Sequence, residues 1–138
     1  MTVGLKAHYF WFPIGTGDFL HSFFSTISYN LEPNGWGTKY PVLLKSLYHE
    51  QLDKAQIPAL QEELNNAREL LMDIPPNKVI WDIEDLSKRP PWGDDISPEI
   101  TSLGNYFVSS DSKQVFDIFL KAIETALQYD LDLRIHSM

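Results

Sequence analysis

The sequence predicts an α+β fold, with a single, mostly antiparallel sheet of about four strands and three to four helices packed against it. Two observations support this prediction. Some segments place apolar residues at every second position, and others place them three or four residues apart. The two kinds of segment follow no regular strand–helix–strand repeat, which a parallel sheet would require. With 138 residues and neither a linker nor an internal repeat, residues 1–138 are expected to form one domain.

Four segments are predicted to be strands. Apolar side chains alternate over residues 3–12, and they alternate strictly over residues 131–135. Residues 79–83 are rich in β-branched and aromatic side chains and follow a double proline, so we expect them to form the central strand. Residues 105–109, Asn-Tyr-Phe-Val-Ser, are expected to form the remaining strand.

Helices are predicted where the apolar residues are three or four positions apart. Residues 18–30, 58–72 and 116–127 each carry such a stripe, which indicates one face turned to a core. Residues 38–52 fit either a helix or a short strand, and the leucine spacing favours the helix.

Capping residues predict where several of these helices begin. Thr16 or Asp18 is expected to cap the first helix, and the run Ser110-Asp111-Ser112 is expected to cap the last. Ser97 followed by Pro98 is typical of a helix start, so a further helix of one or two turns is expected there.

The net charge is −8, and the acidic excess lies in the second part of the chain. Residues 1–60 hold four basic and four acidic side chains, whereas residues 61–138 hold seven basic and fifteen acidic ones. Such a surface disfavours nucleic-acid binding and would attract a basic partner, although it would equally serve solubility alone. The lack of cysteine fits a reducing cytoplasm, and no segment is apolar enough to span a membrane.

Residues 89–95, Arg-Pro-Pro-Trp-Gly-Asp-Asp, predict a rigid loop after the central strand. The two prolines exclude regular structure, and the glycine and aspartates favour a turn. The loop presents Trp92, Asp94 and Asp95. Trp92 has two interpretations, because it could anchor an interface or fold back onto the sheet and pin the loop. A rigid loop of this composition favours binding over chemistry.

Asp82, Glu84 and Asp85 are the main candidates for chemistry. On an extended chain Asp82 and Glu84 would share a face, as paired acid–base or metal-binding carboxylates do. The four histidines lack metal-ligand spacing, and the sequence contains neither a cysteine nor a nucleophile motif. We therefore expect no catalytic residue and no metal site, and a small carboxylate-dependent enzyme, with or without a metal, is the alternative.

Several segments along nearly the whole chain resemble the immunity protein 70 family of bacterial polymorphic toxin systems. The resemblance is carried by residues 79–85, 90–93, 100–103 and 105–108, by His8-Tyr9-Phe10-Trp11-Phe12 near the start, and by residues 116–135 near the end.

This resemblance implies a cytoplasmic protein, encoded beside a secreted toxin, that binds the toxin domain and blocks it without catalysis or a cofactor. An acidic inhibitor could cover the basic cleft of a nuclease toxin by imitating phosphates. A general adaptor that binds a resident partner remains a further alternative, and the oligomeric state stays open. The expected contact region consists of Trp92, Asp94, Asp95, Asp82, Glu84 and Asp85.

Overall fold

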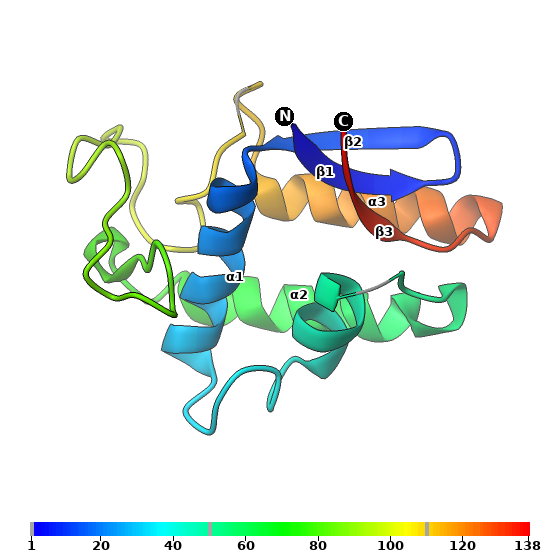
Figure 1. Cartoon of the computed structure of the whole chain (residues 1–138), viewed down its shortest axis with the longest axis horizontal. Helices are drawn as coiled ribbons and strands as arrows, with labels where there is room; N and C mark the ends of the chain where they lie inside the picture. Colours follow the sequence, from blue (N-terminus) through cyan, green and yellow to red (C-terminus); the bar gives the residue numbers. More distant parts are fainter. Residues whose placement is uncertain (1, 50, 110) are drawn as a thin grey trace.

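A computed structural model describes residues 2–49, 51–109 and 111–138 and has the predicted α+β architecture, with three strands rather than about four. Strand β1 (Val3–Ala7) lies in the middle of the sheet, between β2 (Phe10–Gly15) and β3 (Arg134–Ser137), and both neighbours are antiparallel to it. The sheet lies at one side of the molecule, where the first and last strands are neighbours (Figure 1).

Three α-helices cover one side of this sheet. Helix α3 (Val115–Tyr129) packs against the sheet, α2 (Ile57–Leu71) packs against α3, and α1 (Gly17–Leu31) runs steeply across them (Figure 1). The other helices are short: a π-helix η1 (Val42–Leu47) and the single-turn 3₁₀ helices η2 (Lys54–Gln56) and η3 (Pro76–Lys78). No helix in the described part of the chain is long and apolar enough to cross a membrane.

The first predicted strand, residues 3–12, is instead a β-hairpin. Ala7 pairs with Phe10, so His8 and Tyr9 form the connection, and His8 adopts the left-handed conformation with φ of 54°. Histidine tolerates this conformation better than most residues, which allows a turn without glycine. The alternation of apolar residues continues across the turn, and for that reason the pattern reads as one strand.

Residues 79–83 do not form a strand, and the prediction of a central strand there is wrong. Their backbone is bonded by hydroxyl side chains of α1 in place of a neighbouring strand. Ser22 Oγ donates to the Ile80 carbonyl over 2.7 Å, and Thr26 Oγ1 accepts from the Ile80 N–H over 3.0 Å. Ser25 Oγ accepts from the Ile83 N–H over 3.2 Å. The segment is therefore an irregular chain fixed along a helix.

The two remaining strand predictions fare differently. Residues 105–109 form no strand, and only Val108 makes an isolated bridge, with Gln114. The segment is held instead by burial, since Phe107 is almost fully enclosed in the core. Residues 131–135 are partly right, because β3 begins at Arg134 and Leu133 makes an isolated bridge with Leu52.

The helix predictions are confirmed for α1, α2 and α3, and residues 38–52 contain the favoured helix in the form of η1. Thr16 caps α1, with its Oγ1 accepting the Phe19 N–H over 3.2 Å. Gln114 is the N-cap of α3 and makes no side-chain capping bond, so the predicted cap at residues 110–112 is wrong for Asp111 and Ser112, and Ser110 lies outside the described residues. The expected helix after Ser97 is only a turn.

The core lies between the sheet and the three helices and is built around aromatic rings. Phe23 of α1 is fully buried, and its ring centroid lies 4.9 Å from Phe116 and 5.2 Å from Phe119 on α3. Phe107 reaches the same cluster, 5.4 Å from Phe23. This contact attaches the segment between α2 and α3 to the centre of the domain, which fixes its position.

Candidate partner-binding site

The connection between α2 and α3 forms an irregular platform beside α1. It contains η3 and a series of turns, and its loops lie at one end of the molecule (Figure 1). Its backbone is bonded at several points, with Asn30 Nδ2 donating to the Lys78 carbonyl over 3.1 Å and the Leu103 N–H donating to the Ile74 carbonyl over 2.9 Å. An irregular segment with this many anchors can present side chains at fixed positions.

Trp92 is held in place and still partly accessible. Its Nε1–H donates to the Tyr106 hydroxyl over 2.7 Å, and its ring meets that of Trp81 almost at a right angle, with 5.5 Å between centroids. Phe19 of α1 lies edge-on to it at 6.3 Å. The side chain remains 37% exposed. Trp92 therefore pins the loop, as one of the two interpretations expects, and part of its ring stays accessible to solvent.

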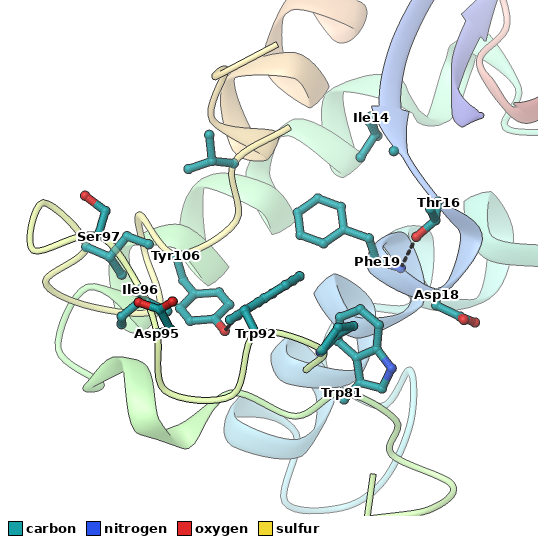
Figure 2. Close-up of a pocket in the computed structure, with 14 residues that line it drawn as sticks. Ile14, Thr16, Asp18, Phe19, Trp81, Trp92, Asp95, Ile96, Ser97 and Tyr106 are labelled. Carbon is teal, nitrogen blue, oxygen red and sulfur yellow. Dashed lines mark hydrogen bonds between the residues drawn. The ribbon is translucent and has the colours of Figure 1, made fainter. Parts of the chain in front are cut away.

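A hollow of about 660 Å³ lies beside Trp92, between the start of α1 and the platform. This volume falls in the range of ordinary ligand-binding pockets. Figure 2 shows Trp92 between Tyr106 and Trp81, with the Phe19 ring close by and Ile14 beyond it. Most of the lining is apolar. The full lining comprises Ile14, Gly15, Thr16, Asp18, Phe19, Trp81, Pro91, Trp92, Asp95, Ile96, Ser97, Ile100, Tyr106 and Val108.

Asp82 stabilises the turn that it begins. Its Oδ1 accepts the Glu84 N–H over 2.9 Å and lies 3.3 Å from His21 Nε2, while Lys88 Nζ is 3.7 Å from Oδ2. The Glu84 N–H bond is the main reason why the pKa of Asp82 is lowered, and His21 and Lys88 contribute to the same direction. Because residue 82 begins a turn, Asp82 and Glu84 do not share the face of a strand, which corrects that expectation.

Asp85 has a similar local role. Its Oδ1 accepts the Ser87 hydroxyl over 2.6 Å and the Ser87 N–H over 3.2 Å. These two bonds lower the pKa of Asp85, with the hydroxyl bond contributing most. The carboxylate therefore stabilises the turn in its ionised form.

The predicted contact residues do not gather in one hollow. Trp92 and Asp95 line the hollow beside Trp92, whereas Asp94 borders a second one on the Lys78 and Arg89 side. Asp82, Glu84 and Asp85 line neither. Asp94 is strongly exposed and lies 3.8 Å from Arg89 Nη2. Of the five acidic residues, Asp94 and Asp95 therefore border two different hollows, and the other three border neither.

The chain matches the model of the immunity protein 70 family, Imm70, over residues 5–135. The chain belongs to the Imm70 family. The match begins within β1 and ends within β3, so it includes the platform and both tryptophans. Membership of Imm70 implies an immunity protein of a toxin system. No curated protein and no solved structure matches the chain.

The sequence alone did not indicate several residues of this candidate site. Phe19, Trp81 and Tyr106 complete the aromatic wall, yet they come from three separate segments, and spacing alone gives no sign that they meet. His21 was assigned no role. It lies between Asp82 and Tyr48, whose hydroxyl is 3.1 Å from His21 Nδ1. Burial raises the pKa of Tyr48.

The His21 contacts tie three parts of the fold together, namely α1, the acidic turn and the C-terminal end of η1, where Tyr48 is the capping residue. The Trp36 ring stacks near His21 at 6.3 Å and donates its Nε1–H to the Leu44 carbonyl over 2.7 Å. Within residues 2–49, 51–109 and 111–138, no three histidine, aspartate or glutamate side chains are grouped so that they could hold a metal ion. The contacts found here position the acidic turn.

Proposed function

We propose that this chain binds a cognate toxin domain and neutralises it by stoichiometric protein–protein contact. The observation that carries the proposal is the Imm70 match, because it spans residues 5–135 and therefore nearly the whole domain. The protein would act in the cytoplasm, where it would meet the toxin domain before that domain reaches its target.

The contact region is proposed to be the acidic and aromatic part of the platform. A partly exposed tryptophan held by other side chains loses little entropy on binding, which suits an interface anchor. The carboxylates around it would steer and pair with lysine or arginine. Asp82 and Asp85 would act mainly by fixing the turn, since their oxygens already accept backbone bonds. The proposed residues are Trp92, Asp94, Asp95, Asp82, Glu84 and Asp85.

The partner is proposed to carry a basic surface, as a nuclease toxin would. The net charge of −8 and the fifteen acidic side chains in residues 61–138 support this choice. Opposite charge accelerates the encounter of two proteins, and a carboxylate-rich surface can occupy a site built for phosphates.

The test is protection of a sensitive cell. The toxin domain encoded next to this chain would be expressed with and without it, and growth would be measured. The proposal predicts that growth is restored by the chain. No protection from a chain shown to be folded and present would contradict the proposal and favour a resident binding partner.

Matched variants would assign the protection to the platform. The double variant Trp92→Ala with Asp95→Asn is expected to protect less than the natural chain. Glu124→Gln is the control, since it removes an exposed carboxylate of α3 that is remote in sequence from the platform. Equal protection by the double variant and the control would remove the platform from the proposal, while immunity itself would stand.

A further inference from the structure

We infer that the hollow beside Trp92 binds an arginine side chain presented by the partner protein. The identity of that partner rests on the proposed function, whereas the chemistry of the hollow rests on its own lining. Three features support an arginine: the aromatic walls, two carboxylates at the rim, and the size and fixed shape of the space.

The aromatic walls suit a flat cation. Trp81 and Trp92 stand at 88° to each other, so they form two sides of a corner, and Phe19 lies at 67° to Trp92. Figure 2 shows these rings close together, with Tyr106 beside Trp92 on the side away from Trp81. The face of a tryptophan attracts cations through its quadrupole more strongly than that of any other side chain. Guanidinium is planar and weakly hydrated, so it stacks on such a face better than the ammonium group of lysine.

Two carboxylates border this aromatic corner from different segments. Asp18 belongs to the first turn of α1, and Asp95 belongs to the loop after Trp92. They lie on opposite sides of the group of side chains in Figure 2. Neither takes part in an ion pair or a side-chain hydrogen bond within the described residues. An apolar occupant would desolvate these two carboxylates without pairing them. The guanidinium group of arginine could instead pair with one carboxylate while its plane stacks on a tryptophan face.

The N-terminus of α1 also borders the hollow, and its repulsion of a cation is outweighed by the nearby carboxylates. A helix N-terminus carries a partial charge of about +0.5, which repels cations. Asp18 places a full negative charge in that first turn, and Thr16 already accepts the Phe19 N–H. With Asp95 included, the local balance is negative, which agrees with the acidic character of the whole chain.

The space is prepared before binding. Trp92 is held by its bond to Tyr106 and by the Trp81 ring, so this ring does not have to be ordered when the cation enters. The apolar part of the lining, which includes Ile14, Ile96 and Ile100, would cover the methylene stem of the arginine. The hollow can therefore accept the whole side chain.

The test uses small probes and needs no toxin. N-acetyl-arginine N-methylamide would be titrated into the ¹⁵N-labelled full chain at constant ionic strength, and the four indole N–H signals would be followed. Saturable shifts are expected for Trp81 and Trp92, while Trp11 and Trp36 serve as internal references, since neither lines the hollow. The corresponding citrulline and leucine compounds, which are uncharged, are expected to show dissociation constants at least about fivefold higher.

Variants complete the test. Asp18→Asn and Asp95→Asn are each expected to weaken arginine binding at least about twofold, and Trp92→Leu is expected to abolish the saturable shift. The two asparagine variants keep the inference testable if Trp92→Leu fails to fold. An arginine compound without effect, or one that binds no better than citrulline and leucine, would overturn the inference. If the arginine compound failed to bind but the natural chain still protected cells from the toxin, the proposed function would stand and only the inference about the hollow would fall.

Discussion

At the scale of single residues, Trp92 has two roles that can be separated. Its indole N–H bonds to Tyr106, and its remaining exposed ring surface is the proposed contact with the toxin domain. A neutral hydrogen bond contributes about 1 kcal/mol to folding, whereas an interface anchor contributes about 2 kcal/mol or more to binding. Removing the side chain also removes its packing against Trp81 and Phe19, so the effects on folding and on binding have to be measured separately.

Trp92→Ala is expected to weaken toxin binding by about 2 kcal/mol or more, or roughly thirtyfold, with the fold intact. Calorimetric titration with the toxin domain and thermal unfolding of the free chain would measure the two effects separately. Trp92→Phe keeps a ring but loses the N–H, so it should lie between the natural chain and Trp92→Ala in affinity. A large fall in melting temperature with unchanged affinity would make Trp92 a purely structural residue.

The stability of the chain in acid should depend on Asp82. The Glu84 N–H, with help from His21, lowers the pKa of Asp82 in the folded state. Its contribution to stability is then fully present above the ordinary aspartate pKa of about 3.9 and is lost as the pH falls through the lower folded value. The free energy of unfolding of Asp82→Asn is therefore expected to fall less steeply as the pH is lowered than that of the natural chain.

Urea unfolding at a series of pH values between neutrality and strong acid would measure this difference. Asp85→Asn should act in the same direction, because the Ser87 bonds also lower the pKa of Asp85. If Asp82→Asn lost stability with acid as steeply as the natural chain, the ionised carboxylate would not be what stabilises the turn.

At the scale of elements, close backbone approach sets the geometry of the hairpin. A Cβ placed on Gly4 would overlap the Phe12 carbonyl oxygen and lie 2.8 Å from the Pro13 Cα. Both obstacles are backbone atoms of the paired strand, so the hairpin would have to open. Gly17, at the start of α1, has room, because the nearest atom to a Cβ there is Val3 Cγ2 at 3.8 Å.

Gly4→Ala is accordingly expected to lower the free energy of unfolding by about 2 kcal/mol or more. Gly17→Ala is the matched control and should be neutral or stabilise by about 0.5 kcal/mol, because alanine restricts the unfolded chain and suits a helix. Chemical unfolding of both variants gives the comparison. Equal effects of the two substitutions would contradict the close approach of β1 and β2.

The helices could be predicted from sequence because each carries its own periodic apolar stripe. The irregular platform could not, because its backbone partners are Ser22, Ser25 and Thr26 of α1, polar residues whose role depends on a tertiary contact. Residues 79–83 have strand-like composition and find no strand to pair with. The β-branched and aromatic residues of this segment would suit a strand, but no neighbouring strand is available, and the hydroxyl groups of α1 bond its backbone instead.

Only part of the candidate site could be predicted from the sequence. The prolines around Trp92 identified a rigid loop, since their effect on the backbone is local. The aromatic wall from Phe19, Trp81 and Tyr106 depends on how α1 meets the platform, and no local pattern contains that information. The acidic cluster at residues 82–85 was identified, but its turn geometry gives Asp82 and Asp85 a structural role that an extended strand would not.

At the scale of the whole molecule, the proposal of a basic partner depends on how charge is distributed along the chain. The chain carries −8 overall, and its second part holds the excess. Such a charge acts over about a Debye length, about 8 Å at physiological salt, and speeds association with a basic surface.

The association rate constant with the toxin domain is therefore expected to fall about tenfold or more between low and high salt. The dissociation rate constant should change much less, because exposed charges act mainly on the encounter. Glu84→Gln with Asp94→Asn should reduce the slope of the salt dependence, as measured by stopped-flow mixing. An association rate that does not respond to salt would leave the acidic surface with solubility as its role.

The central claim is that this chain neutralises a toxin by occupying it, and a titration tests this most directly. Purified toxin domain would be mixed with increasing amounts of the chain, and the remaining toxin activity would be measured after a short and a long incubation. We predict a linear loss of activity that is complete at one equivalent and independent of incubation time. Full activity at excess chain, or a loss that is completed by far less than one equivalent and grows with time, would contradict stoichiometric binding.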